Sequence, residues 1–165
     1  MKIKYNSPVI LTYTILSIAA LILSSSNHVA GLFTSPASLS FFDPLFYFRL
    51  IFYTVGHAGR AHLMGSLMII LLIGPLLEEK YGSTKLLEMF CITAATTAII
   101  NAAIFSNSLI GGSGLAFMLI LLGSFSNIKS KEIPLTFVFI AVLFIGNEVA
   151  ATLKVDGISQ FSHLA

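Results

Sequence analysis

Charged residues are scarce in this chain, and cysteine is almost absent. Asp, Glu, Lys and Arg together make up 10% of the 165 residues, whereas a soluble domain of this size carries about 25%. A chain so poor in charge cannot cover its surface with groups that favour water. The formal net charge of +2 is small and scattered, which argues against a nucleic-acid-binding protein. Because Cys91 is the only cysteine, no intrachain disulfide is possible.

Hydrophobic residues dominate instead, and they fall into long segments. They make up 56% of the sequence, and the mean hydropathy is +0.94. A helix needs about 20 apolar residues to cross a bilayer, and such segments occur at residues 8–24, 61–77 and 133–151. The stretch 89–128 has no charged residue and is long enough for two crossings, separated near residues 106–112. These segments predict five membrane spans.

A sixth span is predicted to begin near Ile158. The chain ends at Ala165, two residues after His163, so we expect this span to be incomplete. The predicted fold is therefore all-α: a polytopic membrane helical bundle that forms a single domain over residues 1–165. One alternative stays open for the first segment, because Lys2 and Lys4 followed by an apolar stretch also describe a secretory signal peptide.

Residues 45–53 form an aromatic-rich segment with one charge, Arg49. Aromatic rings favour the membrane interface, so we expect this segment to lie in the membrane surface. A short true span is the alternative.

The basic residues indicate an orientation. If the spans alternate, six of the nine lie on the same side as the N-terminus, which the positive-inside rule makes cytoplasmic. These six are Lys2, Lys4, Lys80, Lys85, Lys129 and Lys131. The chain is thus predicted to be an integral multi-pass protein of the cell (plasma) membrane, with the lipid bilayer as a partner and a cytoplasmic N-terminus.

A serine in a glycine-rich turn is the first candidate for chemistry. Counting back from Lys129 at about 1.5 Å per helical residue places Ser113 roughly 24 Å above the inner interface, short of the far side of a core about 30 Å thick. The preceding segment must therefore enter the membrane as irregular backbone, which is tolerated only inside protein or beside a wet cavity. Gly111, Gly112 and Gly114 suit such a bend. A plain flexible connection has the same composition.

Histidines supply the candidate partners of Ser113. His163 begins the last helical segment on the same predicted side, where a neutral imidazole could accept the serine proton. With no obvious buried carboxylate to orient it, a Ser–His dyad is indicated rather than a triad. His62 and Ser66 share one face of the second span near its outer end. Phe117 shares the helical face of Ser113. The plain alternatives are a hydrogen-bonded interfacial histidine and an ordinary apolar phenylalanine.

Other protease chemistries find little support. The segment from His57 to His62 lacks both the glutamate and the spacing of a zinc-binding His-Glu-x-x-His motif. An aspartyl intramembrane protease needs paired aspartates inside spans, but Asp43 and Asp156 are the two aspartates and both fall in loops. Neither a metal nor another cofactor is predicted.

Taken in order, the motifs of this chain resemble those of the rhomboid family over nearly its whole length. Gly56–Leu63 looks like the start of that family's second span, which carries a His-x-x-x-Asn element. Gly74–Gly82 looks like the glycine–glutamate–glycine turn that follows. Gly111-Gly112-Ser113-Gly114 matches the Gly-x-Ser-Gly nucleophile motif, and Asp156–Ala165 looks like the start of the span that carries the base.

This resemblance implies a six-span helical core that cleaves single-span membrane proteins near the outer ends of their transmembrane helices. It implies that Ser113 is the nucleophile, His163 the general base, and His62 with the Ser113 backbone N–H the oxyanion site. Phe117 would stack on His163, and Glu78 would cap the inner loop structurally. The oxyanion- and substrate-binding set is thus His62, Ser66, Gly112 and Phe117.

One departure from the family pattern keeps a second function open. The family has asparagine four residues after the histidine, whereas this chain has Ser66. A hydroxyl is shorter than an amide and offers a single donor. Together with the incomplete sixth span, this substitution leaves a non-catalytic rhomboid-like protein that binds membrane-protein clients as the alternative.

Overall fold

The structure is a computed structural model, and it describes residues 5–24, 31–104 and 108–125, with residues 135, 138–140, 142, 143 and 146 as well. Within these ranges every regular element is a helix, so the all-α prediction is confirmed. The chain divides into two compact units, residues 1–119 and 120–165. The prediction of one domain over residues 1–165 stays a prediction.

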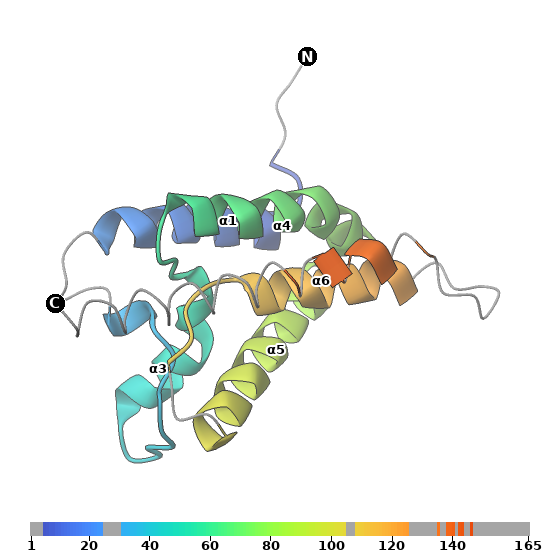
Figure 1. The fold of residues 1–165 in the computed structure, drawn as a ribbon. Coiled ribbons are helices and arrows are strands. Elements are labelled where there is room, and N and C mark those ends of the chain that lie inside the picture. The colour runs from blue at the N-terminus through green and yellow to red at the C-terminus, as the bar shows by residue number, and fades with distance from the viewer. Residues whose placement is uncertain are drawn as a thin grey trace, which may run out of the picture. The chain divides into compact units, whose positions relative to one another are not determined.

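The helices follow the predicted segments closely, with two changes of boundary (Figure 1). The elements are α1 (Pro8–Leu23), η1 (Gly31–Phe33), α3 (Pro44–Phe52), η2 (Tyr53–Val55), α4 (Arg60–Tyr81), α5 (Ser83–Ile104) and α6 (Ser113–Phe125). Helix α4 continues beyond Leu77 to Tyr81, and α5 begins at Ser83 rather than near Met89. The predicted end of the second segment at Leu77 is therefore wrong, since only Gly82 separates the two helices.

Two of the described helices are long and apolar enough to cross a membrane. Helices α4 and α5 have 22 residues each, with hydropathies of 1.8 and 1.6, and at about 1.5 Å per residue each exceeds the thickness of the hydrocarbon core. The apolar helices at residues 8–23, 44–55 and 113–124 are shorter. The number of spans therefore remains a prediction.

The face of α4 that points away from the other described helices is apolar. Met64, Met68, Leu72 and Leu76 are 61–72% exposed and recur every four residues along one side. A helix that buries one face and exposes large apolar side chains on the other fits a lipid environment better than water. Large apolar side chains of α1 and α5, such as Ile22 and Ile92, are also exposed. Together these surfaces indicate a membrane protein.

Glu78 joins the ends of three helices. Its carboxylate accepts hydrogen bonds from the backbone N–H groups of Val9, at 2.9 Å, and Ile10, at 3.1 Å. These belong to the first turn of α1, whose donors have no acceptor within the helix. The Ser83 hydroxyl at the start of α5 donates to the same carboxylate at 2.7 Å. The buried Glu78 therefore fixes the end of the first unit where α1 starts and α4 stops, in agreement with the structural role expected for it.

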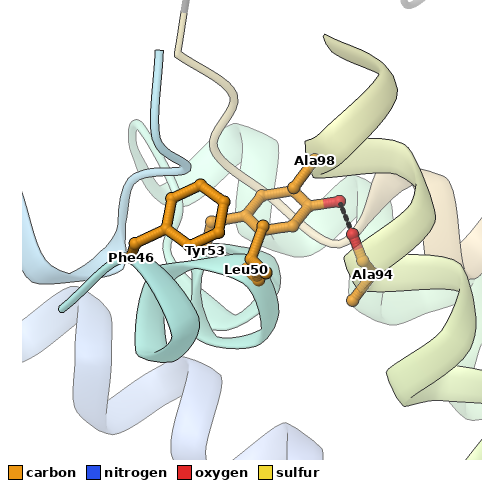
Figure 2. Close-up of a cluster of buried hydrophobic side chains, with 5 residues drawn as sticks. All are labelled: Phe46, Leu50, Tyr53, Ala94 and Ala98. Carbon is orange, nitrogen blue, oxygen red and sulfur yellow. Dashed lines mark hydrogen bonds between the residues drawn. The ribbon is translucent and has the colours of Figure 1, made fainter. Parts of the chain in front are cut away.

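Helix α3 is docked against α5 by a compact apolar cluster (Figure 2). Asp43 caps α3 by accepting from Leu45 N–H at 2.9 Å, and nine residues are too few for this helix to cross a membrane. Phe46, Leu50 and Tyr53 pack on Ala94 and Ala98, whose small side chains allow close approach. The Tyr53 hydroxyl also donates to Ala94 C=O at 3.3 Å. This cluster fixes η2, and η2 in turn supports the candidate site.

Candidate active site

Ser113 is the first residue of α6. Residues 108–112, immediately before it, are not helical, which is the irregular approach that the sequence predicts. Helical hydrogen bonding begins with Ala116 N–H, which donates to Gly112 C=O at 2.9 Å. The N–H groups of the first turn of a helix have no intrahelical acceptor, and they carry the positive end of the helix dipole. A half-buried serine hydroxyl thus lies beside the backbone donors of a helix N-terminus.

The turn before Ser113 is attached to the rest of the first unit by backbone hydrogen bonds. Gly111 N–H donates to Tyr53 C=O at 3.0 Å. Further upstream, Leu109 and Ser35 bond reciprocally: Ser35 N–H donates to Leu109 C=O at 2.8 Å, and Leu109 N–H donates to the Ser35 hydroxyl at 2.7 Å. The turn is therefore held by η2 on one side and by the segment after η1 on the other.

The His62 imidazole lies directly against Gly111. A Cβ atom at Gly111 would lie 2.5 Å from Cε1 and 2.7 Å from Nε2 of His62, closer than Cβ atoms approach other atoms in proteins. Gly111 also has φ of +116°, a conformation that residues with side chains rarely adopt. Glycine is therefore required at residue 111 for two reasons, its backbone conformation and the lack of space for a side chain. Because it has no side chain, the His62 imidazole of α4 can lie against this turn.

Tyr13 of α1 contacts the same turn. A Cβ atom at Gly112 would overlap the Tyr13 hydroxyl oxygen and would lie 3.3 Å from Thr54 C=O. The Tyr13 hydroxyl donates to that carbonyl at 2.6 Å. Neither Tyr13 nor Thr54 was predicted as a site residue. No sequence signal could have found them, because an apolar helix that carries a tyrosine is common and the partner lies 41 positions away.

A second histidine, His57, packs against His62. His57 is 4% exposed, its Nδ1–H can donate to Val55 C=O at 3.1 Å, and its ring meets that of His62 edge to face with centroids 5.2 Å apart. Among the described residues, its Nε2 has no hydrogen-bond partner. Burial lowers the pKa of His57 to about 4, and the neighbouring His62 contributes in the same direction. His57 is therefore neutral near pH 7. Its uncharged ring packs against the ring of His62.

The other predicted site residues lie on the expected helices. Ser66 is buried on α4, one turn beyond His62, and Phe117 is half-buried on α6, one turn beyond Ser113. His163 falls outside the described residues, so the proposed dyad stays a prediction. In the described ranges, no group of three or more His, Cys, Asp or Glu side chains could hold a metal ion.

The arrangement suits acyl transfer chemistry. It combines a serine hydroxyl, the donors of a helix N-terminus and an imidazole at one end of the first unit, and such preorganised donors are what an oxyanion requires. Glu78 and the start of α1 lie at the opposite end of α4 from His62.

Comparison with known proteins agrees with these features. The family model for the rhomboid domain matches residues 45–165, which is well over half of the chain and includes the turn before Ser113. Rhomboid-related protein 1 of Caenorhabditis elegans is 26% identical over 125 residues, a stretch that covers 71% of this chain and 35% of that protein. The chain thus spans about a third of the length of the relative it matches. This chain belongs to the rhomboid family.

Proposed function

We propose that this protein is an intramembrane serine endopeptidase that cleaves the transmembrane helices of other membrane proteins. The contact between His62 and Gly111 carries the proposal, because it brings an imidazole from α4 to the turn that begins α6 at Ser113. Membership of the rhomboid family supports it, since this family includes intramembrane serine proteases that act in the bilayer.

The proposed reaction proceeds through an acyl-enzyme. The Ser113 hydroxyl attacks the scissile carbonyl, and His163 accepts its proton. The oxyanion is stabilised by the Ser113 backbone N–H and by an N–H of the His62 ring, with Ser66 and Gly112 completing the pocket. The C–N bond then breaks, and the leaving amine takes the proton from His163. Water, activated by His163, hydrolyses the ester and frees Ser113. Phe117 would stack on the His163 ring and limit its motion.

The membrane arrangement that goes with this proposal has five spans and the start of a sixth, in one domain over residues 1–165. The N-terminus is cytoplasmic and the protein lies in the plasma membrane. Ser113 then opens towards the outer side, and the substrates are single-span proteins cut near the outer ends of their helices. The predicted alternation of spans puts six of the nine basic residues on the side of the N-terminus, and the positive-inside rule supports this orientation.

A serine-directed fluorophosphonate probe tests the proposal. The purified chain in proteoliposomes should be labelled covalently, and Ser113→Ala should abolish the labelling. Ser108→Ala is the matched control, because Ser108 is an exposed serine of the same connection and should label as the wild type does. Labelling that survives Ser113→Ala would contradict the proposed nucleophile.

A non-catalytic client-binding protein is the second candidate. The observation that favours it is Ser66, a short hydroxyl at the position where the family has asparagine. A model single-span substrate separates the two functions: the protease cleaves it and Ser113→Ala stops the cleavage. The binding protein retains the substrate uncut, and Ser113→Ala leaves that retention unchanged.

A further inference from the structure

We propose that Tyr13, on the first helix, positions Ser113 by acting as a spacer between η2 and Gly112. This inference rests on the proposed function, because it concerns the geometry of the same nucleophile. It adds a residue that lies outside every motif of the site and 100 positions before Ser113 in the chain. Tyr13 is a positioning residue, since it touches the turn and not the substrate.

The Tyr13 side chain is itself tightly held. It is 7% exposed, and its ring packs edge to face against Phe90 of α5, with centroids 5.7 Å apart. Its hydroxyl donates to Thr54 C=O at 2.6 Å. Thr54 is held in turn, because its own hydroxyl donates to Ile51 C=O at 2.8 Å. These contacts fix the position of the Tyr13 side chain.

The Tyr13 hydroxyl fills the space that a side chain at residue 112 would occupy. Gly112 lies so close that an added Cβ would overlap the Tyr13 oxygen and would come within 3.3 Å of Cζ. Close packing of this kind fixes position, because interiors resist even small changes of volume. Gly112 cannot move towards α1 while the phenol is there.

Two consecutive carbonyl groups of η2 thus fix the positions of two consecutive glycines, Gly111 and Gly112. Tyr53 C=O accepts directly from Gly111 N–H at 3.0 Å, and Thr54 C=O holds Gly112 through the Tyr13 hydroxyl. The peptide bond that follows Gly112 carries the Ser113 N–H, the proposed oxyanion donor. Moving a reacting group by about 1 Å can lower a rate about 100-fold, so a spacer at Gly112 governs reactivity at Ser113.

A pair of compensating substitutions tests the spacer. Gly112→Ala should lower the rate of fluorophosphonate labelling at Ser113 about 100-fold, because the methyl group collides with the Tyr13 hydroxyl and displaces the turn. Adding Tyr13→Phe removes the oxygen that collides and leaves the ring. The double variant should regain about tenfold in rate over Gly112→Ala, which corresponds to about 1.4 kcal/mol. A residue that merely stabilised the fold would make the double variant worse than either single one.

Gly111→Ala is the matched control, because its methyl group would meet His62 and not Tyr13. Tyr13→Phe should give no recovery in that background. Recovery in both backgrounds, or in neither, would overturn the proposal, as would wild-type labelling by Gly112→Ala alone. Unfolding temperatures of all variants show whether a low rate reflects loss of fold.

If Gly112→Ala does not fold, Tyr13→Phe alone decides. We expect it to fold and to label severalfold more slowly than the wild type, whereas an unchanged rate would overturn the spacer. The wild-type chain separates this result from the proposed function. A wild type that does not label contradicts both proposals, whereas a labelled wild type without the compensation contradicts only the role of Tyr13.

Discussion

His62 on α4 and Gly111 in the turn before α6 lie far apart in the chain, yet the imidazole leaves no room for a side chain at residue 111. The His-x-x-x-Ser element and the Gly-Gly-Ser-Gly turn each predicted a polar group near the same end of the protein. The family resemblance implies that the two meet at an oxyanion site, but neither motif by itself predicts the contact. The contact brings the His62 imidazole to the turn that leads into Ser113.

Substitution of His62 should therefore affect reactivity more than folding. We expect His62→Ala to lower the cleavage rate of a model substrate about 100- to 1000-fold, the usual effect of removing one oxyanion donor. The measurement is the initial rate in proteoliposomes, with the unfolding temperature of the variant as the control for folding. A rate within a factor of about two of the wild type would exclude His62 from the oxyanion site.

The stability of the protein should fall in weak acid because of His57. Its pKa is about 4 in the folded chain, compared with about 6.5 for an ordinary histidine. The unfolded chain therefore binds a proton between pH 6.5 and 4 that the folded chain does not bind. The stability associated with neutral His57 is complete above pH 6.5 and is lost as the pH falls towards 4, by about 2–4 kcal/mol.

Comparison with His57→Asn isolates this effect from other titrating groups. An asparagine amide can donate to Val55 C=O as Nδ1–H does, but it does not titrate. Thermal unfolding in detergent, followed from pH 7.5 to 4.5, should show a smaller loss of stability for the variant. Equal losses in the two proteins would show that His57 is not the group responsible.

At the scale of the elements, the first unit is organised by helix ends. Pro8, Asp43 and Gly82 mark where helices start or stop, and their roles follow from local chemistry: proline fits the first turn, aspartate caps, and glycine ends a helix. Glu78 is different, because it caps a helix that lies 68 positions before it in the sequence. Only the packing of α1 against α4 makes that cap possible.

Loss of the Glu78 carboxylate should destabilise the protein strongly. Glu78→Ala leaves the N–H groups of Val9 and Ile10 and the Ser83 hydroxyl without their acceptor, and we expect a loss of about 2–4 kcal/mol in the free energy of unfolding. Glu79→Ala is the matched control. Glu79 is exposed on the next residue, so its substitution should change stability by less than about 0.5 kcal/mol.

Cys91 gives a direct measurement for this pair. It is the single cysteine of the chain and is partly buried on α5, so a thiol-reactive fluorophore reports its exposure as the protein is heated. Similar unfolding temperatures for Glu78→Ala and Glu79→Ala would contradict the role of Glu78.

For the molecule as a whole, the exposed apolar faces of α1, α4 and α5 determine the environment. A soluble protein would bury such surfaces, whereas lipid leaves no reason to do so. The protein should remain in the membrane fraction after extraction at alkaline pH, which releases peripheral proteins. A tag on the N-terminus should be accessible to protease only after the membrane is opened, because this end is predicted to be cytoplasmic. Release by alkali, or digestion of the tag in intact cells, would contradict the predicted topology.

Much of the described fold could be predicted from hydropathy and turn residues. The segments at 8–24 and 61–77 became α1 and α4, and the aromatic segment became the short helix α3, because apolar length and proline or glycine breaks are local properties. The boundary near Leu77 was wrong because charged residues usually end an apolar helix. Here Glu78 stays helical, because the backbone N–H groups of Val9 and Ile10 at the start of α1 donate hydrogen bonds to its carboxylate.

The sequence by itself determined the helical class, the apolar helices and the position of the nucleophile turn, since each depends on residues that are neighbours in the chain. Only the tertiary structure decided which groups meet at that turn. The contacts of Gly111 with His62 and of Gly112 with Tyr13 join positions separated by a large part of the chain, and they exist because particular helix faces pack together. Periodicity identifies an apolar face, but it does not identify the partner of that face.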